Sequence, residues 1–233
     1  MPFGDIFGAF YNIFGLILLL VGVFIFAVGF YGFKRKRLIE NTPTSKIRSL
    51  AMGLVEIYGD VIPAQGKTLV SPLTQKNCVY YHYLVERYEE HYNSSTKKTE
   101  GRWVTVQNEK HSIPFDLQDE TGMVLVDPNQ ASIQISKNYE TRQGNMRYTE
   151  WYIEPNEKLY ILGTAGENPN RIEDSASHVE NIMIQKGREE KQYLISDKSE
   201  KQLLKSLSIM MYVPWCIGIV LIVAGVIILL RLI

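Results

Sequence analysis

The chain has 233 residues and a formal net charge of zero, from 25 basic and 25 acidic side chains. Between Leu38 and Lys205 it carries 20 basic and 24 acidic side chains. A mildly acidic region of this kind excludes a broad basic surface for nucleic acid. Its single cysteine, Cys78, excludes a disulfide within the region, which fits a reducing compartment.

Two long apolar stretches lie at the ends of the chain. Ile6–Phe33 holds no charged side chain, and neither does Tyr212–Leu230. A helix needs about 20 such residues to cross the hydrocarbon of a bilayer. A cleaved signal peptide is disfavoured for the first stretch, because it is too long and no basic residue precedes it. We therefore predict transmembrane helices at residues 6–33 and 206–231, a basic linker at 34–40 and a soluble domain at 41–205.

Glycines recur every seven residues inside both stretches. Seven residues complete nearly two turns of an α-helix, so each set forms one stripe. Small residues let helix backbones approach closely in lipid. We expect the two stripes to pair the spans; a homo-oligomer through the first stripe and the general abundance of glycine in membrane helices are the alternatives. The stripes are Gly8, Gly15, Gly22 and Gly29 in the first span and Gly218 and Gly225 in the second.

A basic cluster directly follows the first stretch. It consists of Lys34, Arg35, Lys36 and Arg37. The excess of basic residues in cytoplasmic loops predicts that this cluster and the soluble domain lie on the cytoplasmic side, with both termini outside. Arg231, after the second span, opposes this orientation weakly. We expect the cluster to contact anionic lipid headgroups.

Short runs of β-branched and aromatic residues between turn residues fill the middle of the chain. They predict a mainly β fold, an antiparallel barrel or sandwich with short flanking helices. Thr42-Pro43 is typical of a helix start, so a short helix is expected from Pro43 to about Leu50. Residues 53–59 predict a strand that continues over 61–63 past a bulge at Gly59. The tyrosine-rich residues 77–90 predict a central strand with bulky side chains on both faces.

Later segments predict hairpins and a closing helix. Ile113–Leu117 and Met123–Val126 flank a turn in which Gly122 is expected to supply a positive φ. Asp197 and Glu200 form a capping-box pattern that opens a helix at Lys198, and Pro214 is expected at the membrane entry. Further strands are expected at 103–107, 132–136, 147–153 and 158–165, and a last pair at 181–184 and 192–195.

Several segments resemble one known family. They are Asn41–Arg48, Glu56–Gly59, Ile113–Leu117 with Thr121-Gly122, Val126–Pro128 and Tyr193–Ser196. Together they are similar to the GIDE domain, also called the beside-a-membrane (BAM) domain, the middle region of Mulan-type mitochondrial E3 ubiquitin ligases. The resemblance covers most of Asn41–Met211, includes one span on each side, and is most specific at Pro114–Leu117. The compact chain resembles the prokaryotic members of the family.

The resemblance implies ubiquitin ligase activity, but the sequence departs from the ligases. In them a RING domain follows the second span, and its Cys and His ligands hold two zinc ions. Here the sequence ends at Ile233, so we expect the activity not to transfer. The ligase domain faces the mitochondrial intermembrane space, whereas the charge pattern here predicts the cytoplasm.

No group of residues predicts catalysis. Cys78 and His82, with His91 and His111, could hold zinc or form a Cys–His nucleophile, but no paired cysteine spacing supports either. Asn93-Ser94-Ser95 fits a glycosylation sequon that a cytoplasmic domain would not use. Four acids near the hairpin could bind calcium, but they match no EF-hand loop and are more simply turn residues. They are Asp116, Asp119, Glu120 and Asp127.

These observations predict a non-catalytic binding or sensor module held beside the bilayer, without a catalytic residue, cofactor or metal. Its expected partners are membrane lipids and a protein near the membrane surface, not nucleic acid. The alternative is a component of an E3 ubiquitin or ubiquitin-like ligase system whose RING is supplied by another chain. A hydrolase that uses Cys78 or the acids is a third hypothesis.

Overall fold

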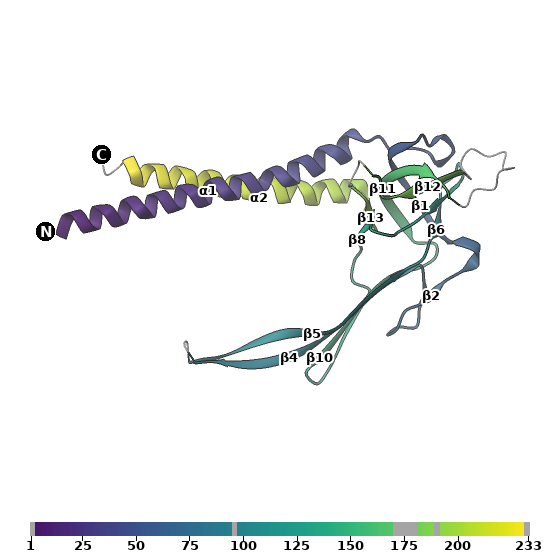
Figure 1. Cartoon of the computed structure of the whole chain (residues 1–233), viewed down its shortest axis with the longest axis horizontal. Helices are drawn as coiled ribbons and strands as arrows, with labels where there is room; N and C mark the ends of the chain where they lie inside the picture. The colour runs from purple at the N-terminus through teal and green to yellow at the C-terminus, as the bar shows by residue number, and fades with distance from the viewer. Residues whose placement is uncertain (1–2, 95–96, 170–180, 189–191, 231–233) are drawn as a thin grey trace. The chain divides into compact units, whose positions relative to one another are not determined.

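The computed structural model describes residues 3–94, 97–169, 181–188 and 192–230, and the side chains of all of these except residues 3–9, 35 and 93. It divides into two compact units, a helical unit of residues 1–41 with 200–233 and a β domain, Thr42–Ser199. Figure 1 labels the elements of both. The prediction of a mainly β domain between two apolar helices is confirmed.

The helical unit consists of α1 (Phe3–Asn41) and α2 (Glu200–Leu230). Both helices are long and apolar enough to span a membrane. Residues 34–40 continue α1 and do not form a separate linker. Pro214 lies inside α2 and not in its first turn. Its place at the membrane entry stays a prediction. Proline is tolerated inside membrane helices because neighbouring groups satisfy the backbone that it leaves unpaired.

Five strands of the β domain close into a barrel. They are β1 (Gly53–Pro63), β6 (Phe115–Gln118), β7 (Met123–Val126), β11 (Lys158–Glu167) and β12 (Ile182–Gln185). Around the ring the order is β1-β6-β7-β12-β11 and back to β1. All pairings are antiparallel except β7 with β12. This order is that of the five-stranded Greek-key barrel called the OB-fold.

Two connections of the barrel are long and carry strands of their own. The β1–β6 connection contains β2 (Leu69–Val70), β3 (Asn77–Cys78), β4 (Tyr80–Asn93) and β5 (Lys98–Ser112). The β7–β11 connection contains β8 (Ser132–Gln134), β9 (Tyr139–Gln143) and β10 (Met146–Ile153). A second sheet, β5-β4-β10-β9, joins the two connections and extends away from the barrel (Figure 1). We call this sheet the arm.

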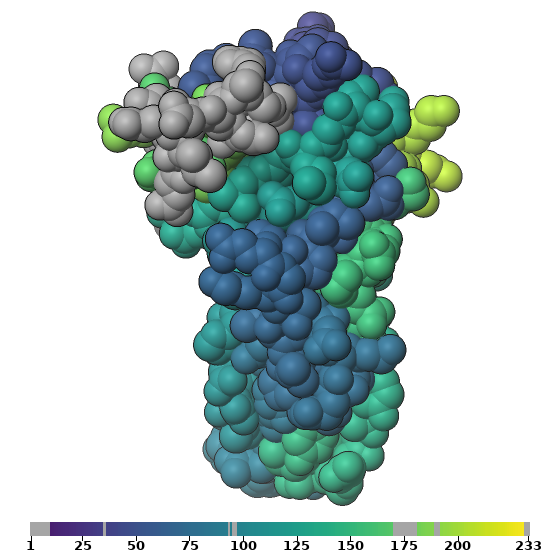
Figure 2. All heavy atoms as spheres, turned by 90° about the vertical axis from the view of Figure 1, so that its right-hand side faces the viewer, coloured from purple at the N-terminus to yellow at the C-terminus, as the bar shows by residue number. Residues whose placement is uncertain are grey.

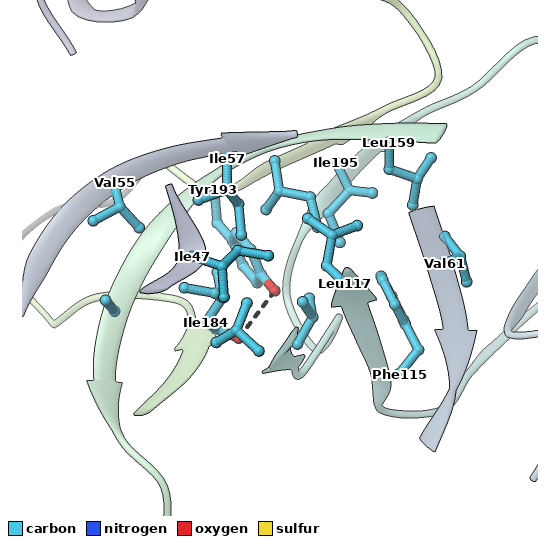
Figure 3. Packing of buried hydrophobic residues seen from close by; sticks show 14 of the residues in the cluster. Ile47, Val55, Ile57, Val61, Phe115, Leu117, Leu159, Ile184, Tyr193 and Ile195 are labelled. Carbon is cyan, nitrogen blue, oxygen red and sulfur yellow. Dashed lines mark hydrogen bonds between the residues drawn. The ribbon is translucent and has the colours of Figure 1, made fainter. Parts of the chain in front are cut away.

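The core of the β domain fills the barrel. Alternate residues of each strand point inward, as the period of two requires, and are at most 5 % exposed. Ile47, from the 3-10 turn η1 (Ile47–Ser49), joins the cluster, and Tyr193 donates from its hydroxyl to the carbonyl oxygens of Asp127 (2.5 Å) and Ile184 (3.4 Å) (Figure 3). The inward residues include Val55, Ile57, Phe115, Leu117, Val124, Val126, Leu159, Ile161, Ile182 and Ile184.

Two expectations about local structure are wrong. The helix expected from Pro43 reduces to η1, because Thr44 instead forms a parallel β-bridge with Glu56. The bulge expected at Gly59 is replaced by a close approach: a Cβ there would lie 2.3 Å from the carbonyl oxygen of Gln118. β1 therefore runs unbroken from β11 to β6.

Strands far apart in the sequence pair in ways the sequence did not predict. Residues 181–184 and 192–195 do not pair with each other, since β12 and β13 (Leu194–Ser196) both pair with β11. The returning strand expected at 103–107 is part of the 15-residue β5. The strand expected at 158–165 extends two residues further, because β11 ends at Glu167.

The β6–β7 hairpin itself is confirmed, but its turn uses Asp119 and not a positive φ at Gly122. One Asp119 carboxylate oxygen accepts from the Thr121 and Gly122 amides, and the other accepts from the Ile47 amide at 3.0 Å. Burial alone would raise the pKa of Asp119, but hydrogen bonds from Thr121, Ile47 and Gly122 hold it below its ordinary value. The carboxylate therefore fixes the turn and attaches η1 to it.

Replacing Asp119 should make the β domain less stable. Asp119→Ala leaves several amides without their acceptor, and we expect a loss of about 1–2 kcal/mol. Because the pKa is lowered on folding, the contribution is present above the unfolded value and is lost as pH falls through the folded pKa. Thermal unfolding of the full chain in detergent at neutral pH and near pH 3 measures both effects.

Glu120→Gln is the control for Asp119, because it breaks the exposed ion pair with Lys46 and should leave the stability nearly unchanged. An Asp119→Ala variant as stable as Glu120→Gln at neutral pH would contradict this role of Asp119.

Candidate interaction surface

The arm is held together by contacts between strands, since its side chains are mostly half-buried or exposed. β4 lies between β5 and β10, so the prediction of a central strand is confirmed. Burial along β4 is uneven: Tyr80 and Val85 are buried, whereas Tyr88 is 39 % and Tyr92 60 % exposed. Figure 2 shows the arm as a narrow extension in which blue, teal and green strands lie together.

One face of the arm is built from stacked and charged pairs. The rings of His82 and Trp151 stack at 4.6 Å, and the His82 Nε2 hydrogen bonds with Asn108 at 2.9 Å. Nearer the tip, the Arg147 guanidinium lies 4.3 Å from the Trp103 ring centre and pairs with Glu86 at 2.6 Å. These contacts join side chains of neighbouring strands, and they stabilise the sheet on a face that has no hydrophobic core.

The opposite face of the arm gathers five tyrosines, which we call the tyrosine face. Tyr81 lies opposite Tyr152, and Val85 lies opposite Tyr148, so these side chains share one face. Tyr81 and Tyr83 are half-buried, and Tyr139 is 44 % exposed. Burial raises the pKa of Tyr81 and Tyr83, so both hydroxyls stay neutral at physiological pH. The members are Tyr81, Tyr83, Tyr139, Tyr148 and Tyr152.

A buried carboxylate lies within the tyrosine face, because Glu150 is opposite Tyr83 on β4 and Tyr139 on β9. Glu150 is fully buried and accepts from the amides of Leu73 (2.8 Å) and Thr74 (3.0 Å) and from the Thr74 hydroxyl (2.6 Å). These bonds fasten the turn between β2 and β3 to the arm. A buried carboxylate is tolerated when donors surround it. Nothing local in the sequence indicates this contact, since the partners lie more than 70 residues apart.

Cys78 is fully buried next to this turn, in surroundings that disfavour the thiolate. Burial, with Glu150 and Glu154 nearby, raises its pKa to about 12. The thiol therefore stays protonated, whereas a nucleophile or zinc ligand must be a thiolate. No group of three His, Cys, Asp or Glu side chains that could hold a metal occurs among the described residues. His82 and His111 instead stack on Trp151 and Tyr81.

The four acids near the hairpin do not form one site. Asp119 and Glu120 border an open polar hollow of about 470 Å³ with Asp60 and Lys158. Asp127 borders a different hollow of about 400 Å³, where the β1–β6 connection leaves and rejoins the barrel. Burial raises the pKa of Asp116. The second hollow is lined by Ala64, Gln65, Lys67, Ile113, Pro114, Leu125, Asp127, Pro169 and Met183.

The glycines of the two helices lie where α1 meets α2. A Cβ at Gly22 would lie 3.0 Å from the Gly218 carbonyl oxygen, and one at Gly225 would lie 2.8 Å from the Gly15 carbonyl oxygen. A Cβ at Gly29 would lie 2.3 Å from the Trp215 ring, which packs among Phe26, Phe30 and Phe33. The structure thus brings together all the predicted glycines except Gly8, whose surroundings are not described.

The basic cluster occupies the C-terminal part of α1. Lys34 and Arg37 are exposed, and the Arg37 guanidinium lies 5.4 Å from the Phe33 ring centre. Lys36 pairs with Glu40 one turn later, at 3.4 Å. The side chain of Arg35 lies outside the described part. Within the part of the chain that the structure describes, Lys34 and Arg37 form no ion pair, and Arg37 lies over an aromatic ring.

The fold and these surfaces can be compared with known proteins. The family model described as GIDE, E3 ubiquitin ligase, matches residues 85–228. The chain belongs to the GIDE family. The match begins within β4 and ends in α2, so it includes most of the arm, four barrel strands and the Pro114–Leu117 segment. The GIDE resemblance is thus confirmed, although Asn41–Arg48 and Glu56–Gly59 lie outside the matched residues. No curated protein and no solved structure matched this GIDE chain.

Removing the Glu150 carboxylate should expose Cys78. Glu150→Ala leaves the Leu73 and Thr74 amides unpaired and removes a negative charge that raises the pKa of Cys78. We expect maleimide to label Cys78 at least about tenfold faster, in a Cys216→Ser background, with a stability loss of about 1–3 kcal/mol. Glu90→Ala, in the same sheet, should leave the labelling unchanged; equal rates in both variants would contradict the anchoring role.

Adding a methyl group at Gly29 should weaken the packing of α1 on α2. Gly29→Ala places the new Cβ against the Trp215 ring, whereas a Cβ at Gly32 meets Met211 at an ordinary 3.5 Å. We expect Gly29→Ala to cost about 1–3 kcal/mol and Gly32→Ala to be nearly neutral. Thermal unfolding in detergent, followed by Trp215 fluorescence with Trp103 and Trp151 replaced by Phe, measures the difference. Equal midpoints for the two alanine variants would contradict the prediction.

Proposed function

We propose that this GIDE protein is a membrane-anchored, non-catalytic binding module whose arm recognises another protein. The observation that carries the proposal is the tyrosine face. Tyrosine offers a large apolar ring with a polar end and is enriched at protein interfaces. The β2–β3 turn covers this face around Glu150, but Tyr139 is exposed and the other four tyrosines are half-buried, so each keeps ring surface that a partner can contact.

The non-catalytic part of the proposal is supported by the chemistry of the residues present. A RING holds two zinc ions with about eight Cys and His ligands. The 233 residues contain two cysteines and four histidines, and Cys78 is a buried, protonated thiol. These 233 residues therefore contain too few Cys and His side chains to supply that ligand set. The alternative function is a component of an E3 ubiquitin ligase system whose RING comes from another chain, as the family description suggests.

We further propose that the glycine stripes pair the two spans and that the soluble domain lies in the cytoplasm. Small residues at the α1–α2 contact support the pairing. Lys34–Arg37, after the first span, support the orientation and a contact with anionic lipid headgroups. An impermeant protease added to sealed, right-side-out vesicles should leave the β domain intact, and digestion of that domain would overturn the orientation.

The test of the function uses a photo-crosslinking residue in the full chain in its own cells. At Tyr148, on the tyrosine face, we expect a discrete crosslinked protein. The matched control is Tyr58, a barrel tyrosine of the β domain that is 40 % exposed. The same pattern from both positions, or no product from Tyr148, would contradict recognition by the tyrosine face.

A second measurement separates the binding module from the ligase component. The purified chain is mixed with a ubiquitin-charged conjugating enzyme, and the rate of ubiquitin discharge is followed. We expect the rate to equal that without the chain, because no zinc-bound RING is present to activate the thioester. Faster discharge by the chain alone would show that it is catalytic.

A further inference from the structure

One edge of the arm is formed by an unusually long strand with nothing paired along it. β5 has 15 residues and lies at the end of the sheet order β5-β4-β10-β9. At about 3.4 Å per residue it is about 50 Å long. Twelve of its residues are exposed and three are half-buried, so no described element covers it. Such an edge presents backbone donors and acceptors to any strand that can align with it.

A bulge decides which β5 residues share a face. The register between β4 and β5 shifts between Val85 and Glu86, where Val106 is the extra residue on β5. Arg102 lies opposite Glu89, and Glu109 lies opposite Tyr83, six residues earlier in β4. Glu89 and Tyr83 are an even number of residues apart on β4, so they point to the same face, and so do their partners Arg102 and Glu109. Arg102 and Glu109 are an odd number of residues apart on β5 because the bulge adds one residue between them.

The same argument places Glu100 and His111 on that face, since they lie opposite His91 and Tyr81. Two copies of β5 can therefore align antiparallel about a two-fold axis between Thr105 and Val106. In this register Arg102 of each copy lies opposite Glu109 of the other, and Glu100 lies opposite His111. Every directly opposed pair shares a face, the two bulges meet at the centre, and no like charges oppose each other.

Neighbouring registers are less favourable. Sliding one strand by two residues in one direction places Glu100 opposite Glu109 in both halves of the pair, which like-charge repulsion disfavours. Sliding it in the other direction places Arg102 opposite His111 and Glu109 opposite Val104, so both ion pairs are lost. The sequence of β5 thus selects one self-complementary register.

The free charges of β5 fit this pairing. Among the described residues no ion pair involves Arg102 or Glu109, and Arg102 is exposed. Glu109 accepts a hydrogen bond from Gln107 at 2.8 Å on its own strand. Gly101, opposite Lys110 in the aligned pair, lies against the Tyr88 side chain, because a Cβ at this position would collide with the Tyr88 hydroxyl. We propose that β5 is a homodimerisation edge, where two copies of this chain join their arms into one continuous antiparallel sheet.

The proposal goes beyond the binding function, because it uses the edge of the arm and leaves the tyrosine face free. It also differs from pairing through the first glycine stripe, of which Gly15, Gly22 and Gly29 contact α2 of the same chain. Two spans hold each copy in the membrane plane, which raises the effective concentration of the edges toward each other.

Charge exchange at one pair tests the register. Arg102→Glu creates two Glu–Glu contacts in a homodimer, and Glu109→Arg creates two Arg–Arg contacts. We expect each variant to raise the dimer Kd on the order of tenfold, measured by light scattering of the full chain in detergent over a concentration series. The double variant should return to the wild-type Kd, and 1 M salt should reduce the single-variant effects.

Mixing the two single variants is the decisive measurement. Each mixed pair has two Glu–Arg contacts, so the mixture should dimerise about as well as the wild type, which also shows that both variants are folded. Arg188→Glu makes the same charge change at an exposed residue outside β5 and should leave the Kd unchanged. A monomeric wild type, a dimer insensitive to both exchanges, or a mixture no better than the single variants would overturn the proposal.

Discussion

The β domain depends on the pairing of β4 with β10. These strands come from two different connections of the barrel, and their ladder runs from Tyr80–Ile153 to Arg87–Met146. Without it each connection would leave a two-stranded hairpin, and an isolated hairpin is at best marginally stable in water. With it the two hairpins become one four-stranded sheet, and the bonds from Glu150 on β10 fasten the β2–β3 turn as well. The arm is therefore a joint product of both insertions.

This origin explains the composition of the arm. A sheet that leaves the barrel cannot bury one face on a core, so cross-strand contacts must supply the stability that burial supplies elsewhere. Stacked His82 and Trp151, and Trp103 under Arg147, serve that purpose on one face. On the other face the tyrosines combine apolar contact with a polar hydroxyl that can stay wet. The residues that stabilise the arm are thus also the residues that a partner would meet.

The features predicted from sequence are those whose cause is local. The β6–β7 hairpin, the apolar helices and the seven-residue spacing of glycines all depend on neighbours within about ten residues. The errors concern distant partners. Gly122 looked like the turn residue because the link from Asp119 to Ile47 spans 72 positions. β12 and β13 looked like a pair because both are short strands near Gly187, yet the long β11 offers each a better edge. The tyrosine-rich strand looked like core because propensity does not report which side of a sheet is covered.

The barrel and the arm contribute differently to the proposed function. The OB-type barrel fixes where its connections start and end, but a fold does not by itself determine what a protein binds. In this GIDE chain the two lengthened connections supply the proposed binding surface, through a face rich in tyrosine and an edge with a self-complementary charge pattern. A single residue inserted in β5 or removed from its bulge would exchange the two faces of half the strand and destroy that pattern. Recognition by the edge therefore depends on register as much as on residue type. The sequence of β5 alone does not show which of its charges share a face, because that depends on the bulge in its pairing with β4.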